Sequence, residues 1–328
     1  MNHDFLEIIR YATKAPSGHN TQPWRFSFEE STISIKPNLE VALPVVDGGN
    51  RELYISLGCA TENLLIATPH FGYTAHIVRS DAAEITVELC KSNAVIEDSL
   101  FYQIERRQTN WSVYNGRKIA NNQLEVLQSI RHEDNIHVYF HEIGSPFADT
   151  LTQYIARGNG IQMSDGAFRE ELLSWMRFNK MQVKKRGDGL SYKIFGSPSL
   201  PEIIAKPIVR LFLKPDPQNQ SDLKKITSSS HFVLFTTKYN TVEEWIELGQ
   251  LLQRFLLAAT ELGIASAFCN QPCEVASLAT ELQNIPELKG EYPTLILRIG
   301  YAHPMPFSPR KKLDEVIEYF FAHNVPKR

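Results

Sequence analysis

Two long apolar segments, residues 51–67 and 243–262, constrain the fold of this chain more than any other feature. Each has apolar residues at helical spacing on most of its circumference, which is typical of a helix buried at the centre of a protein. Each is followed by a glycine suited to end a helix, Gly72 or Gly263, and then by a strand pattern. We interpret the similarity as a weak internal duplication, in which two halves of one chain associate as the subunits of a symmetric dimer do.

The composition is that of an ordinary globular protein. Of the 328 residues, 43% are hydrophobic and 22% are charged, which allows a real core, and the length predicts about two domains. The net charge is −3 and no block of like charge stands out, so we expect neither nucleic acid nor a membrane as a partner.

Three further observations bear on the compartment. The cysteines Cys59, Cys90, Cys269 and Cys273 are too few for a disulfide framework in a chain of this length, which is typical of a reducing compartment. No apolar run approaches the roughly 20 residues that cross a bilayer. Residues 1–7 lack the basic start of a signal peptide. We therefore expect a cytoplasmic protein.

The hydrophobic patterns predict a mixture of strands and helices. Strands are expected at 24–28, 32–36, 73–79, 84–90, 231–237, 264–268 and 294–301. Besides the two apolar segments, helices are expected from Asp4 and at 98–107, 122–131, 145–157, 165–182, 272–282 and 311–321. Residues 183–230 are the least regular, and we interpret them either as a lid or insertion or as a variable surface excursion.

The segment from Ala15 to Pro23 is a polar loop between a helix pattern and a strand pattern. Pro16 and Pro23 fix the backbone, Gly18 allows a positive φ, and the side chains between them offer hydrogen-bond donors and acceptors. A rigid polar loop between two regular elements is suited to hold a ligand, although an ordinary connection has the same composition.

The string Pro-Ser-x-x-Asn-x-Gln-Pro-Trp in this loop resembles the N-terminal flavin-contact loop of the nitroreductase family, whose members bind FMN. The resemblance implies that Pro16, Ser17, Gly18 and Asn20 lie against the flavin. It implies that Gln22, Pro23 and Trp24 support the loop. In that family the loop reaches across a dimer interface to a flavin held mainly by the other subunit.

Two basic segments are similar to the family's phosphate-binding segments. The first, Arg106-Arg107-Gln108-Thr109-Asn110-Trp111, resembles an Arg-Arg-Ser/Thr-x-Arg motif, although Trp111 stands where the family usually has Arg or Lys near the flavin N1–O2 edge. The second, Ser308-Pro309-Arg310-Lys311-Lys312-Leu313, resembles the C-terminal basic segment. Residues Arg106, Arg107, Thr109, Arg310 and Lys312 are thus implied as cofactor-binding residues. Taken alone, these basic residues would be interpreted as solvated surface charges.

A third stretch, residues 263–271, resembles the family's turn that leads over the central flavin ring. The resemblance places Cys269, Asn270 and Gln271 near flavin N5. The Cys269-x-x-x-Cys273 spacing is not that of a usual metal or redox pair, so we expect no metal site.

The order of the motifs indicates a fused pair of halves. In the ordinary family the Arg-Arg motif precedes the Pro-Ser loop, whereas here it follows the loop by about ninety residues. A double-length nitroreductase-like chain explains this order, because the loop of one half then meets the phosphate-binding residues of the other. We therefore expect an α+β, three-layer nitroreductase-like fold with a mostly antiparallel sheet in each half. The expected halves are residues 1–97 and 98–328, the second carrying a lid or insertion at about 183–230, and together they would bind one FMN.

The resemblance implies an FMN-dependent oxidoreductase of the nitroreductase type. NAD(P)H would reduce the bound FMN, which would then reduce a small electron-poor acceptor such as a nitroaromatic or a quinone. We nominate no catalytic side chain, because the flavin carries the chemistry. The alternative is an FMN-sequestering protein with a lid over the flavin and little reductase activity. A scaffold protein that has lost its flavin is a further alternative. The chain is expected to be a monomer with a pseudo-dimer core or a homodimer.

Overall fold

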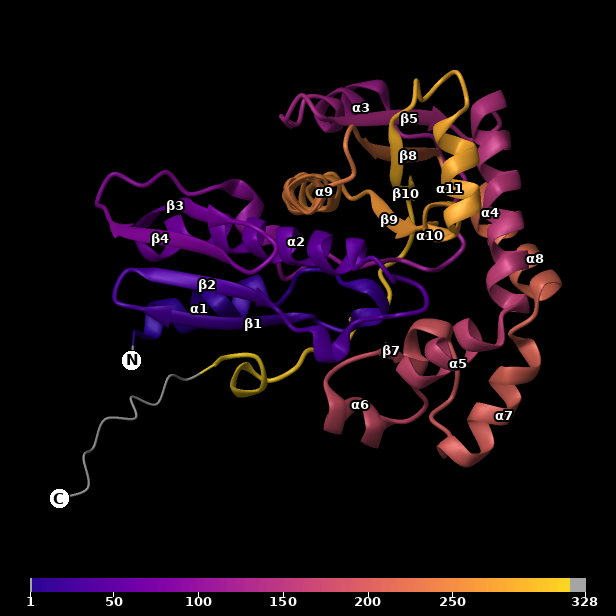
Figure 1. The fold of residues 1–328 in the computed structure, drawn as a ribbon, viewed down its shortest axis with the longest axis horizontal. Coiled ribbons are helices and arrows are strands. Elements are labelled where there is room, and N and C mark those ends of the chain that lie inside the picture. The colour runs from indigo at the N-terminus through magenta and orange to yellow at the C-terminus, as the bar shows by residue number, and fades with distance from the viewer. Residues whose placement is uncertain (1, 319–328) are drawn as a thin grey trace.

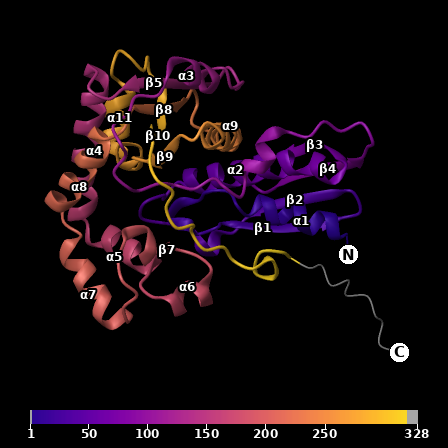
Figure 2. The same ribbon diagram turned by 180° about the vertical axis from the view of Figure 1, so that it is seen from behind.

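The structure, a computed structural model, describes residues 2–318. It contains two four-stranded antiparallel sheets with two long helices between them, so the predicted α+β class is confirmed. Sheet A packs on α2 (Arg51–Ala67) and sheet B packs on α9 (Val242–Glu261) (Figure 1). Figure 2 shows the same arrangement from behind.

Sheet A is built from the N-terminal part of the chain. In spatial order it comprises β1 (Trp24–Glu29), β2 (Thr32–Pro37), β4 (Ile85–Lys91) and β3 (Tyr73–Ser80). Strand β2 alternates buried with half-buried residues, with Ile33 and Ile35 fully buried. Helix α1 (His3–Ala12) contributes Phe5, whose ring packs edge-on against Phe28 and Tyr73 of the sheet.

Sheet B comes from the C-terminal part of the chain. In spatial order it comprises β5 (Ile136–Glu142), β8 (His231–Thr237), β10 (Tyr292–Gly300) and β9 (Ala265–Phe268). Every residue of β8 is buried, which explains its continuous apolar pattern. Val233 and Phe235 face the cluster that contains α9, whereas Phe232 and Leu234 face the opposite side, covered by α4 (Pro146–Ser164) and α11 (Ala276–Gln283).

The two central helices cross at glycines. A Cβ on Gly58 of α2 would lie 2.0 Å from the Ile246 carbonyl oxygen, and one on Gly249 of α9 would lie 2.2 Å from the Ile55 carbonyl oxygen. Each helix therefore presents a glycine to the backbone of the other in the same way. The two helices thus make equivalent contacts at their crossing.

The last described segment joins the two sheets. After β10 the chain runs from sheet B to the edge of sheet A, as both views show (Figures 1 and 2). There the Phe26 N–H donates to the Val316 carbonyl at 2.7 Å, and the Glu318 N–H donates to the Phe26 carbonyl at 2.7 Å. The edge of β1 is thus paired by residues close to the end of the chain.

Residues 165–230 differ from their expected secondary structure. In place of one helix over 165–182, α5 (Gly166–Trp175) ends before the short strand β6 (Met176–Arg177), which pairs in parallel with β7 (Leu190–Ser191). The segment expected to be irregular holds α6 (Lys180–Arg186), α7 (Glu202–Phe212) and α8 (Pro215–Thr227). Asn179 starts α6, because its side chain accepts from the Gln182 N–H at 3.0 Å.

The remaining expected helices fall close to their predicted positions or are shorter. They are α3 (Asn121–Gln128), α10 (Gln271–Glu274) with α11, and the 3₁₀ turns Ser99–Gln103 and Leu313–Glu315. The helix expected at 311–321 is thus only one turn, and residues 319–321 lie outside the described residues.

Candidate functional site

A cavity of about 1330 Å³ lies where the early, middle and late parts of the chain meet. Its wall includes residues 16–20, residues 107–109, the segment Phe268–Gln271 and Arg310. Segments separated by up to about three hundred positions in the sequence therefore share one cavity. The sequence motifs that resemble a flavin site are distributed over these segments.

The polar loop at residues 17–22 has a tight and unusual backbone. His19, Asn20 and Gln22 all have positive φ angles, of 47°, 57° and 54°. Such angles are uncommon for residues other than glycine, so the loop needs compensating contacts. One is internal, because the Ser17 Oγ accepts from the Gln22 N–H at 3.0 Å. Burial lowers the pKa of His19 to about 4, so its imidazole is neutral at pH 7.

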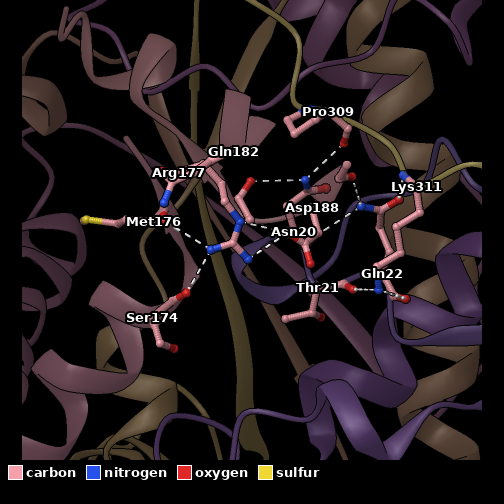
Figure 3. A network of polar contacts seen from close by, with 12 residues as sticks. Asn20, Thr21, Gln22, Ser174, Met176, Arg177, Gln182, Asp188, Pro309 and Lys311 are labelled. Atoms are coloured by element: carbon pink, nitrogen blue, oxygen red, sulfur yellow. Dashed lines mark hydrogen bonds and ion pairs between the residues drawn. The ribbon is translucent and has the colours of Figure 1, made fainter. Parts of the chain in front are cut away.

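The other contacts tie the loop to two distant segments (Figure 3). The Asn20 Nδ2 donates to the carbonyls of Gly189 at 3.2 Å and Pro309 at 3.1 Å. The Gln22 Nε2 donates to the Gly187 carbonyl at 2.8 Å, and the Lys311 N–H donates to the Gln22 Oε1 at 2.9 Å. The loop is therefore held in place from both sides.

A buried ion pair fixes one of those segments. The Arg177 Nη2 lies 2.7 Å from the Asp188 Oδ1, and both side chains are almost fully buried. The same guanidinium donates to the carbonyls of Ser174 and Met176 (Figure 3). Because β6 and β7 are only two residues long, this pair adds a side-chain link between the two segments, and hydrogen bonds from Asn20 and Gln22 join residues 187–189 to the polar loop.

Two arginines converge on one backbone oxygen in the cavity wall. The Arg107 Nη2 donates to the Lys14 carbonyl at 2.7 Å, and the Arg310 Nη2 donates to the same oxygen at 3.0 Å. Arg310 also donates to the Ala15 carbonyl at 3.2 Å and to the Asn20 Oδ1 at 2.8 Å. Both guanidiniums therefore lie directly beside the polar loop.

Within residues 2–318, neither of these arginines forms an ion pair with a carboxylate. The Nε atoms of Arg107 and Arg310 are both buried without a hydrogen-bond partner. Burial lowers the pKa of Arg107 to about 10, and burial together with the charge of Arg107 lowers the pKa of Arg310 to about 9. Burial also lowers the pKa of Lys14, which lines the same cavity. The two arginines therefore carry positive charge with no carboxylate paired to it, and an anion is the ligand that would balance it.

The segment after β9 forms another part of the wall. The Cys269 N–H donates to the Ile296 carbonyl at 2.8 Å, and the Asn270 Oδ1 accepts from the Ile296 N–H at 3.0 Å. The Gln271 Nε2 donates to the Asn159 Oδ1 at 3.1 Å, and its Oε1 is buried without a partner. Burial raises the pKa of Cys269 to about 12, so this thiol stays protonated at neutral pH.

Two half-buried glutamates line the cavity next to this segment. Glu52 accepts from the Asn270 Nδ2 at 3.2 Å, and Glu274 accepts from the Gln162 Nε2 at 2.6 Å. The two carboxyl groups also interact with each other, and burial raises the pKa of each, with the neighbouring carboxylate raising that of Glu52 further. At neutral pH we expect the pair to retain at least one proton.

The side of the cavity formed by residues 168–213 is mainly apolar. It includes side chains from α5, from the turn after β7 and from α7. These residues are Phe168, Leu172, Phe178, Leu190, Tyr192, Ile194, Phe195, Ala205, Ile208, Val209, Phe212 and Leu213. The cavity thus has a cationic region beside the polar loop and an apolar region beneath α7.

Most of the residues selected from the sequence lie in this wall. They are Pro16, Ser17, Gly18, Asn20, Arg107, Thr109, Trp111, Cys269, Asn270, Gln271 and Arg310. Gln22 lies behind the loop and supports it, as described above. Arg106 is exposed and does not line the cavity. Its neighbour Arg107 is buried and lines the cavity.

Lys312 does not join Arg310 in the cavity, contrary to the expected common orientation of residues 310 and 312. Lys312 is exposed, and its N–H donates to the Glu315 Oε2 at 3.0 Å where the last 3₁₀ turn begins. Its neighbour Lys311 instead donates to the Thr21 carbonyl at 2.7 Å. Lys312 itself has extended backbone angles, so its direction away from the cavity follows from its position at the start of this turn.

Sequence reasoning missed Lys14, Glu52 and Glu274. Lys14 directly precedes the polar loop, so its position was a usable signal. Glu52 lies in the helix expected at 51–67 and Glu274 in the helix expected at 272–282, but nothing in their local sequence indicates that the two side chains meet.

Comparison with known proteins gives relatives along nearly the whole chain. No family model matches. A Mycobacterium tuberculosis protein named "Putative NAD(P)H nitroreductase Rv3131" is 23% identical over 326 residues, covering 95% of this chain and 90% of its own length. "Uncharacterized protein Rv3127" from the same organism is 23% identical over 338 residues, covering 94% of this chain and 91% of its own length. The resemblance to nitroreductases therefore extends well beyond the polar loop.

Solved structures with a similar arrangement are more distant. The FMN-dependent nitroreductase NfnB from Mycobacterium smegmatis, in complex with NADPH, is 13% identical, with a TM-score of 0.42 over 66% of this chain and 96% of that one. A nitroreductase-type structure from Anabaena variabilis is 11% identical, with a TM-score of 0.45 over 83% of this chain and 69% of that one.

Proposed function

We propose that the chain is an FMN-dependent oxidoreductase that uses NAD(P)H to reduce a small electron-poor acceptor such as a nitroaromatic or a quinone. The observation that carries the proposal is a pair of guanidiniums, one on the buried Arg107 and one on the half-buried Arg310. They share the Lys14 carbonyl and lack a carboxylate partner among the described residues. A phosphate would balance their charge and accept from their free donors. FMN carries such a phosphate together with a flat ring, and the cavity offers space for both.

The residues around the arginines suit that cofactor. Ser17 and Thr109 add hydroxyl groups to the cationic region, and the loop at Asn20 is held rigidly beside it. Trp111 and residues 269–271 line the same cavity and would contact the ring. When bound, FMN would supply hydride transfer from NAD(P)H to the acceptor.

The size of the cavity supports a second bound molecule. Pockets for ligands of ordinary size measure roughly 300–1,000 Å³, and this cavity of about 1330 Å³ is larger. The apolar region beneath α7 would receive an aromatic acceptor. Close by, Glu52 and Glu274 would hold an ionisable proton at the wall, and Gln271 offers an unpartnered acceptor oxygen.

The arrangement also supports two functional halves in one chain. The polar loop belongs to residues 1–97, whereas Arg107, residues 269–271 and Arg310 belong to residues 98–328. Each half would thus supply what a separate subunit supplies in a dimeric flavoprotein. We infer one FMN per chain, with no second chain needed to complete the site. The relatives named as NAD(P)H nitroreductases support the same class of activity.

The test is anaerobic mixing of the FMN-loaded chain with NADH and, separately, with NADPH. We expect the flavin absorbance near 450 nm to bleach rapidly with at least one of them, and to return when a quinone or a nitroaromatic is added. A flavin that stays oxidised with both would contradict the reductase and would favour the flavin store. Failure to bind FMN at all would contradict both.

A further inference from the structure

We propose that α6 and α7 form a face that binds the surface of an anionic lipid membrane. The face is defined by Lys180, Met181, Lys184, Lys185, Arg186, Lys193, Phe195, Ile203, Ile204, Ile208, Arg210, Leu211, Phe212 and Lys214, all of which are exposed. Helices α6 and α7 lie at the same end of the molecule, with α5 between them, in Figures 1 and 2. The Gln182 Nε2 of α6 donates to the Glu202 Oε2 of α7 at 2.7 Å. This inference does not depend on the proposed enzymatic activity.

The first argument is the exposure of large apolar side chains. Ile203 is 84% exposed, Met181 76%, Leu211 67% and Phe212 66%. Single exposed apolar residues are common, but a concentration of them on one helix marks a surface that contacts another apolar phase. Such strongly exposed side chains protrude, which suits insertion into the boundary between lipid head groups and acyl chains.

The second argument is the local charge. Residues 180–214 contain eight Lys and Arg but only two acidic residues, although the whole chain has a net charge of −3. One of the two acids, Asp188, is buried in its pair with Arg177, and one of the eight basic residues, Arg210, is paired with Glu170 of α5. Counts over the whole chain conceal this local excess, which is why composition alone predicts no membrane partner. Basic side chains interspersed with apolar ones are the pattern of helices that lie on anionic lipid.

The charge also favours lipid over a second copy of the chain. In a two-fold symmetric dimer this face would meet itself and set one cluster of lysines and arginines against another. None of the described helices is long and apolar enough to span a bilayer, so the proposed contact lies at the membrane surface.

Helix α7 lies between the proposed lipid contact and the cavity. Its exposed side carries Ile203 and Leu211, and Ala205, Val209 and Leu213 line the apolar region of the cavity. Ile208 and Phe212 are exposed and also line the cavity. Only one helix therefore separates the proposed lipid contact from the cavity. An apolar molecule dissolved in the membrane would have a short path to the site.

The test is flotation of the full chain with lipid vesicles. We expect it to float with vesicles of phosphatidylcholine and phosphatidylglycerol at low salt, and not with phosphatidylcholine alone. The double variants Ile203→Gln/Leu211→Gln and Lys184→Gln/Lys185→Gln should each lower the bound fraction at least fivefold. The matched controls, Ile96→Gln and Arg131→Gln, change exposed residues elsewhere and should leave it unchanged. Circular dichroism verifies that each variant is folded.

Three results would overturn the proposal. The first is no flotation with anionic vesicles, and retention on an acidic protein in that case would indicate a protein partner. The second is equal binding by the two double variants and the controls. The third is a dimer in light scattering that the double variants dissociate, in which case the face binds a second copy.

Discussion

Arg107 is buried, Arg310 is half-buried, and the two charged side chains donate to the same carbonyl oxygen, which makes them the most informative residues of the chain. A bound anion would stabilise each guanidinium more than water does, because the described protein groups that accept its hydrogen bonds include carbonyl oxygens but no carboxylate. Arg106, adjacent in sequence and exposed, provides an internal control for the same residue type.

Inorganic phosphate should stabilise the flavin-free chain through these arginines. At a concentration about ten times its dissociation constant, phosphate should add about 1.4 kcal/mol to the free energy of unfolding relative to chloride at equal ionic strength. Arg107→Met should abolish the effect and Arg106→Met should preserve it. Thermal melting of the three proteins measures the difference, and equal shifts in all three would show that phosphate acts elsewhere.

The carboxyl pair should make the flavin-free chain less stable as the pH rises. Glu52 ionises at about 4.5 when unfolded, whereas burial and the neighbouring Glu274 raise its pKa to about 8 in the folded state. The folded state therefore binds more protons between these values, and its free energy of unfolding falls by up to about 1.4 kcal/mol per pH unit.

Denaturant titrations at several pH values measure that slope. Glu52→Gln should flatten it, whereas the same change at the exposed Glu40 should not. A slope that is unchanged in Glu52→Gln would mean that the pair does not retain its proton.

At the scale of elements, the crossing of α2 and α9 depends on two glycines. Gly58→Ala places a Cβ about 2.0 Å from a backbone oxygen of α9, so the helices must separate. We expect a loss of at least about 3 kcal/mol in the free energy of unfolding. Gly160→Ala in α4 has open space around it and should be neutral or stabilising by up to about 1 kcal/mol. Urea titrations compare the two, and similar effects would argue against close packing at the crossing.

The ion pair behind the polar loop should matter far more than a surface pair. Arg177→Met leaves Asp188 buried and unpaired, at an expected cost of about 3–5 kcal/mol. Arg157→Met breaks the exposed pair with Glu281 and should cost at most about 1 kcal/mol. Hydrogen exchange should show faster exchange at residues 187–189 in Arg177→Met only. Unchanged protection of residues 187–189 would show that the Arg177–Asp188 ion pair does not support this segment.

Secondary structure was predictable where periodicity decides it. The helix at residues 51–67 has the predicted bounds, and the apolar run at 231–237 is a buried strand. The helix predicted at 165–182 breaks at Met176, because Asn179 caps a new helix and Arg177 pairs with a residue eleven positions later. The spacing of apolar residues over a short stretch of sequence carries no information about such contacts. The irregular composition of 183–230 concealed α7, since Pro207 lies inside that helix.

At the scale of the whole molecule, the site was predictable as far as local motifs define it. The polar loop, Arg107, Arg310 and residues 269–271 meet at one cavity. The meeting of Glu52 with Glu274 was not predictable, because it depends on how the two parts of the chain pack. The apolar region beneath α7 was missed for the same reason, and so was the exposed face of that helix.

The central claim is that one chain binds one FMN through residues from both of its halves. Titration of FMN into the flavin-free chain, followed by quenching of flavin fluorescence, tests it most directly. We predict one FMN per chain, and a dissociation constant raised about 10- to 150-fold by Arg107→Met but unchanged by Arg106→Met. Saturation at one FMN per two chains, or equal affinities in the two variants, would contradict the account.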